Sequence, residues 1–99
     1  MTEIVRRVVI HGRVQGVGYR AWVEDEAQAR GLAGWVRNRR DGSVEAVFGG
    51  GERIVTDMIT ACHRGPAAAR VTAVELHPAD ARALASRVAG ERFSVLGTV

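Results

Sequence analysis

Strand-like and helix-like segments alternate in a fixed order along this chain, and that order limits the possible folds more than any other feature. Short β-branched or alternating stretches predict strands, and apolar residues at helical spacing predict a helix after the first strand and another after the third. With right-handed crossovers, the order β-α-β-β-α-β predicts a split β-α-β sandwich, in which two helices cover one face of an antiparallel sheet. The expected strands cover residues 4–11, 33–38, 43–48 and 70–76. One expected helix covers 20–30, and the other carries an apolar stripe at Ile54, Val55, Met58, Ile59 and Cys62 and stops at Gly65-Pro66.

Glycine and proline mark where these segments end. Gly31 followed by Leu32 is typical of a left-handed helix cap with an apolar residue folded back onto the last turn. The turn signal at 40–42 predicts a hairpin between the second and third strands. We expect the glycines at 49–51 and the pair His77-Pro78 to end the third and fourth strands. Residues 79–90 fit either a loose turn of helix or a loop, and residues 92–96 allow a short terminal strand.

Length and composition predict one domain over residues 1–99. A hydrophobic content of 46% with 25% charged residues is ordinary for a folded domain and argues against disorder. No apolar run approaches the roughly 20 residues of a membrane span, and the N-terminus lacks the pattern of a secretory signal. The single Cys62 cannot form an intramolecular disulfide, which fits a reducing compartment. We therefore expect a cytoplasmic monomer that does not bind membranes.

All basic residues of the chain are arginines. The 14 arginines against 11 acidic residues give a net charge of +3, and the absence of lysine excludes Schiff-base and lysine-base mechanisms. Most of the arginines are scattered along the sequence, as expected for solvated faces. The net charge therefore indicates no more than a mild preference for anionic ligands.

The stretch HGRVQGVGYR, residues 11–20, is unusual for a junction between a strand and a helix. A helix start exposes up to four N–H groups and a partial positive charge, yet no Ser, Thr, Asp or Asn is present to cap them. Glycines let an anion approach the main chain, and Arg20 in the first turn is unfavourable unless negative charge lies beside it. A bound phosphate would satisfy both features; a plain tight turn with Arg20 in water is the alternative reading.

The expected topology brings Asn38 to this loop. Strands one and two run in the same direction with strand three between them, so their C-terminal ends lie at one end of the sheet. Residues 12–19 and Asn38 are therefore expected to meet, although they are far apart in the sequence.

The motifs GRVQGVGYR, GLAGWVRNRRDGSVEAVFGG and RGPAAARVTAVEL resemble the acylphosphatase family, and the resemblance covers roughly residues 5–96. It implies the ferredoxin-like split β-α-β fold and an enzyme that hydrolyses the carboxyl-phosphate bond of acyl phosphates. The implied partners are a small acyl phosphate as substrate and inorganic phosphate as product or competitor. No cofactor is implied.

The resemblance assigns roles residue by residue. The phosphate-binding arginine falls on Arg20, and the asparagine that positions the attacking water falls on Asn38. Two positions depart from the common pattern: Tyr19 replaces a frequent Phe, and Arg39 replaces a small hydroxyl residue. The loop from Gly12 to Tyr19 is expected to cradle the phosphate, with Gln15, Gly16, Val17, Gly18, Tyr19 and Arg20 as its binding residues.

The remaining residues with reactive or aromatic side chains are expected to have structural roles. The histidines show no zinc-type spacing with one another or with Cys62, so we expect no metal, and Cys62 is expected as a small buried hydrophobe. Trp22 and Trp35 are expected to pack in the fold rather than to stack on bases. Asp41 is explained by the hairpin turn and Glu45 by an exposed strand face, and neither receives a catalytic role. The histidines are His11, His63 and His77.

Three alternative functions were also compared with the sequence. RNA-recognition modules share this element order, but they stack bases on aromatics of the first and third strands, where only Phe48 is available, so we expect no nucleic acid partner. A non-catalytic phosphate-binding or regulatory domain of the same fold is a nearer alternative. The third is the phosphate-handling domain found at the start of larger carbamoyl-transferring maturation enzymes. The presence of both Arg20 and Asn38, with no zinc-finger or nucleotide domain after Val99, favours the stand-alone hydrolase.

Overall fold

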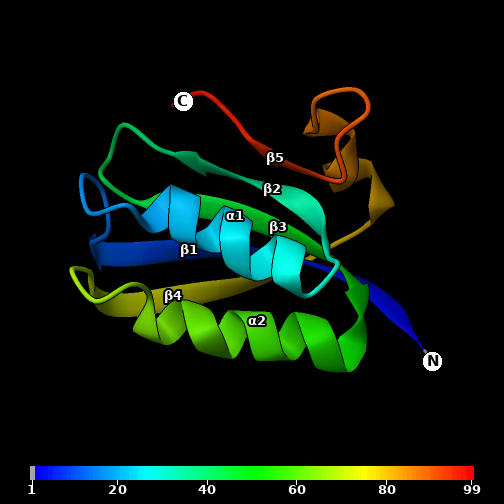
Figure 1. Cartoon of the computed structure of the whole chain (residues 1–99), viewed down its shortest axis with the longest axis horizontal. Helices are drawn as coiled ribbons and strands as arrows, with labels where there is room; N and C mark the ends of the chain where they lie inside the picture. Colours follow the sequence, from blue (N-terminus) through cyan, green and yellow to red (C-terminus); the bar gives the residue numbers. More distant parts are fainter. Residues whose placement is uncertain (1) are drawn as a thin grey trace.

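The computed structural model describes residues 2–99, which form a five-stranded sheet with two helices on one face (Figure 1). The expected β-α-β-β-α-β order, and with it the α+β ferredoxin-like fold, is confirmed. None of the helices within this range is long and apolar enough to cross a membrane. The elements are β1 (Glu3–Arg13), α1 (Tyr19–Ala29), β2 (Ala33–Asn38), β3 (Val44–Gly51), α2 (Glu52–Arg64), β4 (Arg70–Ala79), the 3₁₀ helix η1 (Ala81–Ser86) and β5 (Phe93–Val95).

The strands lie in the order β4-β1-β3-β2-β5. Both β1 and β2 are antiparallel to β3, so they run in the same direction, as predicted. The four predicted strands pair antiparallel as expected, and the short strand β5, which the sequence only allowed, pairs in parallel with β2, so the complete sheet is mixed. The reason is geometric: β4 runs antiparallel to β1, so the chain leaves it at the end of the sheet where β1 and β2 begin. From there η1 carries the chain across, and β5 starts from that same end.

Three strands are longer than predicted. Strand β1 runs from Glu3 through Arg13, two residues beyond its expected end. Strand β3 continues through Gly49, Gly50 and Gly51, which pair with Val5, Ile4 and Glu3 of β1. A Cβ at Gly49 would lie 3.3 Å from Leu84 of η1, and one at Gly50 would lie 2.8 Å from Leu32, so glycine lets neighbours pack closely against this strand. Strand β4 continues through Pro78, opposite Arg6. Proline is tolerated there because β4 is an edge strand, and one of its two hydrogen-bonding edges has no partner strand.

The core lies between the sheet and the two helices. Alternate residues of the central strands point toward the helices and are fully buried, including Val8 and Ile10 of β1 and Phe48 of β3. The helices contribute Val23 and Ala27 from α1 together with Val55, Met58 and Cys62 from α2. Of the other two residues of the predicted apolar stripe, Ile59 packs half-buried against this core, whereas Ile54 is 40% exposed and lies outside it. Cys62 is a buried hydrophobe, as expected.

The end of α1 forms the predicted cap. Gly31 has φ +68°, its N–H donates to the carbonyl of Gln28 at 3.0 Å, and the N–H of Leu32 donates to that of Ala27 at 3.0 Å. These two bonds define a Schellman motif. Leu32 is 1% exposed, so the cap also delivers an apolar side chain to the core.

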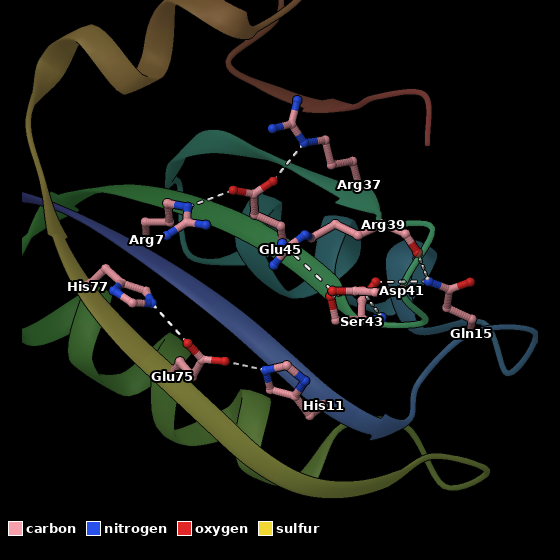
Figure 2. Close-up of polar contacts among 10 residues, drawn as sticks. All are labelled: Arg7, His11, Gln15, Arg37, Arg39, Asp41, Ser43, Glu45, Glu75 and His77. Atoms are coloured by element: carbon pink, nitrogen blue, oxygen red, sulfur yellow. Dashed lines mark hydrogen bonds and ion pairs between the residues drawn. The ribbon is translucent and has the colours of Figure 1, made fainter. Parts of the chain in front are cut away.

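Glu45 lies on the sheet face opposite the helices, and the expectation that it is exposed is wrong. It is 5% exposed, and its carboxylate accepts hydrogen bonds from Arg7 at 2.6 Å and Arg37 at 2.7 Å (Figure 2). The apolar parts of neighbouring side chains pack over the Glu45 carboxylate and cover it. Burial by itself would raise the pKa of Glu45, but the hydrogen bonds and charges of the two arginines outweigh burial and hold that pKa below its usual range.

Replacing Glu45 should show how much its ion pairs with Arg7 and Arg37 stabilise the fold. A Glu45→Gln variant should lose about 2 kcal/mol of unfolding free energy at pH 7, because two charge-assisted bonds weaken and two arginines face each other. Since the folded-state pKa is lowered, the contribution is present above pH 4.5, the ordinary glutamate pKa, and is lost as pH falls through the folded-state value. Urea unfolding at several pH values, with the exposed Glu3→Gln as control, measures this; a difference that does not shrink in acid would contradict it.

Candidate active site

The loop between β1 and α1 has the conformation that its glycines predict. Gly16 has φ +72° and Gly18 has φ +78°, a region in which residues with side chains are strained. Gly18 occupies the N-cap position of α1, and no side chain caps the helix. The sequence-based expectation of an uncapped helix start is therefore confirmed.

The main-chain N–H groups at this helix start are uncommitted. Within residues 2–99, the amides of Gly16, Val17, Gly18, Tyr19 and Arg20 donate to no carbonyl or side chain, and the first bond into the helix runs from Trp22 to the carbonyl of Gly18 at 3.0 Å. Successive free donors at the positive end of a helix dipole form an anion site. Five neighbouring donors are available to such a ligand.

Strand β2 brings Asn38 to this loop. Both line one pocket of about 460 Å³, which also includes Arg20. Figure 1 shows how this happens: the loop before α1 and the β2–β3 hairpin lie side by side at one end of the sheet. The expected meeting of loop and Asn38 is thus confirmed, and it follows from β1 and β2 running in the same direction.

The side chain of Asn38 offers an unused acceptor. Its main chain is fixed, because it pairs with Val44 of β3 and its carbonyl accepts from the N–H of Val99 at 3.1 Å. Its Oδ1, however, is buried and has no hydrogen-bond partner within the described part of the chain. A buried polar atom without a partner costs stability, which is typical of a group kept for a ligand or a reacting molecule.

Arg20 is the charged counterpart of this amide. It is the second residue of α1 and lines the pocket, half-buried. Among residues 2–99 it pairs with no carboxylate, whereas Arg7, Arg30 and Arg37 all do. An unpaired guanidinium in the first turn of a helix is unfavourable against the helix dipole unless an anion binds there.

The comparisons with known proteins identify the family. The acylphosphatase family model matches residues 6–93. The chain belongs to the acylphosphatase family. It is 62% identical to an acylphosphatase of Rhodopseudomonas palustris and 58% identical to one of Bradyrhizobium diazoefficiens, in both cases over the whole of both chains. The crystal structure of acylphosphatase from Bacillus subtilis superposes with a TM-score of 0.80 at 36% identity, over 94% of this chain and 98% of that chain.

Three residues of the glycine loop have side chains that are hydrogen-bonded or packed elsewhere in the fold. The Gln15 amide nitrogen donates to the carbonyls of Arg39 and Ser43, in the β2–β3 hairpin. Tyr19 is 1% exposed, and its hydroxyl donates to the carbonyl of Cys62 at 2.7 Å. Val17 packs against the core and does not line the pocket. These residues can therefore serve a phosphate through their main chain only.

Arg39, which departs from the common acylphosphatase pattern, leaves the pocket lining unchanged. Its guanidinium lies 3.7 Å from the Asp41 carboxylate, on the hairpin, and Arg39 does not line the pocket. Asp41 also accepts from the Ser43 N–H and hydroxyl, so it closes the turn as predicted.

Besides Val14 of the expected loop, the pocket contains three residues that sequence reasoning did not single out: Ala21, Glu24 and Val95. The signal for Glu24 was its position four residues after Arg20, which puts both on one side of α1. Val95 comes from β5, a strand that the sequence only allowed, so its place beside Asn38 could not be predicted.

Other chemical groups lie elsewhere. Among the described residues, no three His, Cys, Asp or Glu side chains are grouped to hold a metal ion. His11 and His77 both contact the Glu75 carboxylate, on the sheet face that Figure 2 shows, opposite the helices. Burial raises the pKa of the Cys62 thiol to about 12, so this thiol stays protonated and is a poor nucleophile.

Proposed function

We propose that acyl phosphates are hydrolysed in this pocket, with the loop amides and Arg20 holding the phosphoryl group and Asn38 positioning the attacking water. The observation that carries the proposal is the juxtaposition of uncommitted groups: five free amides, an unpaired guanidinium and a buried, unpartnered carboxamide oxygen line or border one cavity. Each group is costly without a ligand, and an anion with a water beside it satisfies all of them.

The phosphate end of the substrate binds the main chain of residues 15–20. The free N–H groups of Gly16, Val17, Gly18, Tyr19 and Arg20 donate to it together with that of Gln15, and the two positive-φ glycines let the main chain curl around the oxygens. Arg20 adds a planar pair of donors and a full positive charge. Fixed donors of this kind stabilise charge on the equatorial oxygens in the transition state without having to reorganise.

The leaving group requires no acid. An acyl phosphate releases a carboxylate, whose conjugate acid has a pKa of about 4 like side-chain carboxyl groups. The bonding electrons of the broken P–O bond remain on this carboxylate, and the protons of the attacking water end on the inorganic phosphate. Catalysis is then mainly positioning plus electrostatic stabilisation.

The carboxamide of Asn38 is suited to position the attacking water. A carboxamide both donates and accepts, so the free Oδ1 can accept a hydrogen bond from one O–H of a water molecule while the oxygen of that water is aimed at phosphorus. The pocket lining of one chain already includes Arg20, Asn38 and the loop glycines Gly16 and Gly18. We accordingly propose a monomer of one acylphosphatase-like domain over residues 1–99 that uses neither metal nor cofactor, with the cytoplasm as its expected location.

A titration with inorganic phosphate tests the binding half of the proposal. Amide resonances of Gly16–Arg20 should shift in ¹H–¹⁵N spectra with one dissociation constant, equal to the inhibition constant of phosphate against hydrolysis of benzoyl phosphate in the presence of a chelator. The amides of 51–53, at the uncapped start of α2, serve as the control and should not follow the same curve. Inhibition by phosphate without shifts at 16–20 would contradict the assigned site.

A further inference from the structure

We infer that the Gln15 side chain is a positioning residue that fixes the distance between the phosphate-binding loop and Asn38. This inference rests on the proposed roles of the loop and of Asn38. Gln15 belongs to the loop and lines the pocket, and its side-chain amide bonds to the β2–β3 hairpin (Figure 2).

Both protons of the Gln15 carboxamide are used. Its Nε2 donates to the carbonyl of Arg39 at 2.7 Å and to the carbonyl of Ser43 at 2.8 Å. These residues lie 24 and 28 positions further along the chain and form the two ends of the hairpin turn. Because both acceptors are main-chain atoms, the contact does not depend on the identity of residue 39, and the departure at Arg39 leaves it intact.

The turn that Gln15 grips is itself closed by hydrogen bonds. The N–H of Arg39 donates to the carbonyl of Ser43 at 2.9 Å, and that of Gly42 to the carbonyl of Arg39 at 3.0 Å. The Asp41 carboxylate accepts from the Ser43 main chain at 2.9 Å. Asn38 is bonded directly to Arg39 in the sequence, so a rigid turn transmits the position of Gln15 to the carboxamide of Asn38.

The loop needs such an anchor. Two of its residues are glycines with positive φ, and between positions 14 and 18 of the described chain no other hydrogen bond connects it to the hairpin. Without Gln15, the loop and Asn38 would be related only by the packing of the sheet. A displacement of about 1 Å between the phosphoryl group and its attacking water is enough to cost roughly 10²-fold in rate.

The first test is a split between turnover and phosphate binding. Gln15→Ala should lower kcat for benzoyl phosphate by about tenfold, below the 10²-fold limit for misplacement because packing still holds the loop in part. The inhibition constant of inorganic phosphate should change by less than about twofold, because the loop amides and Arg20 remain. Gln15→Glu should not rescue turnover, since its charged oxygen faces two carbonyls, whereas Gln28→Ala on the exposed side of α1 should behave as wild type. Equal losses in turnover and phosphate binding would overturn the inference.

A double-mutant cycle with Asn38→Ala decides whether Gln15 acts through Asn38. In the Asn38→Ala background, Gln15→Ala should lower kcat by less than about twofold, because no water-positioning side chain remains to be misplaced. A tenfold loss in both backgrounds would show a general structural role and would overturn the inference while leaving the role of Asn38 intact. Full turnover in the single Asn38→Ala variant would instead refute the proposed role of Asn38, and the positioning role with it.

Discussion

Arg20→Ala should lower kcat/KM for benzoyl phosphate by at least about 10²-fold, the loss expected for one preorganised donor to a transition-state oxygen. The guanidinium lines the pocket and pairs with no carboxylate within residues 2–99, so its charge is available to the phosphoryl group. Arg20→Lys should fail nearly as badly, because a compact ammonium cannot reproduce two parallel donors in a plane. Phosphate inhibition should weaken in both variants, since the proposed role of Arg20 includes binding the phosphate product.

Arg53→Ala is the matched control. Arg53 is the second residue of α2, as Arg20 is of α1, and it is exposed at a helix start that also lacks a side-chain cap. Its removal should leave turnover unchanged. Removal of Arg20 should not reduce the thermal midpoint, because a cation in the first turn opposes the helix dipole. Wild-type kcat/KM in Arg20→Ala would end the assignment of Arg20.

Asn38→Ala should lower kcat by about 10²- to 10³-fold with little change in KM, since an interaction made only with the attacking water contributes to the transition state and not to substrate binding. The thermal stability of the Asn38→Ala variant should not fall with its activity. Because the Asn38 Oδ1 is buried without a partner among residues 2–99, its removal should leave the thermal midpoint unchanged or raise it. Activity and unfolding curves measured on one preparation check both halves.

Asn38→Asp provides the second variant at this position. It keeps the shape and an acceptor but loses the donor, and it places a negative charge next to a dianion. We expect both kcat and phosphate affinity to fall, in contrast to the alanine variant, in which phosphate affinity should persist. A lower thermal midpoint together with normal turnover in Asn38→Ala would show that this residue is structural.

Much of the fold could be predicted because its signals are local. The helix cap at Gly31 and Leu32 requires only a left-handed glycine and an apolar follower, and both behave as expected. Element order and the shared direction of β1 and β2 followed from periodicity and crossover handedness. The errors occur where tertiary contacts override local preference. The glycines at 49–51 were expected to end a strand, but pairing with β1 and close packing of Leu32 and Leu84 keep them in β3.

In the candidate site, too, some features follow from local sequence and others depend on tertiary contacts. The free amides of the loop and the unpaired Arg20 follow from residues adjacent in the sequence, since an uncapped, glycine-rich helix start has no local means of satisfying its donors. Which side chains face the cavity depends on contacts between distant segments. The hairpin carbonyls that engage Gln15 lie 24 and 28 residues away, and the cover over Glu45 is assembled from neighbouring strands. Local chemistry therefore determined that an anion could bind here, while strand pairing and side-chain packing, which no single segment encodes, decided which groups surround it.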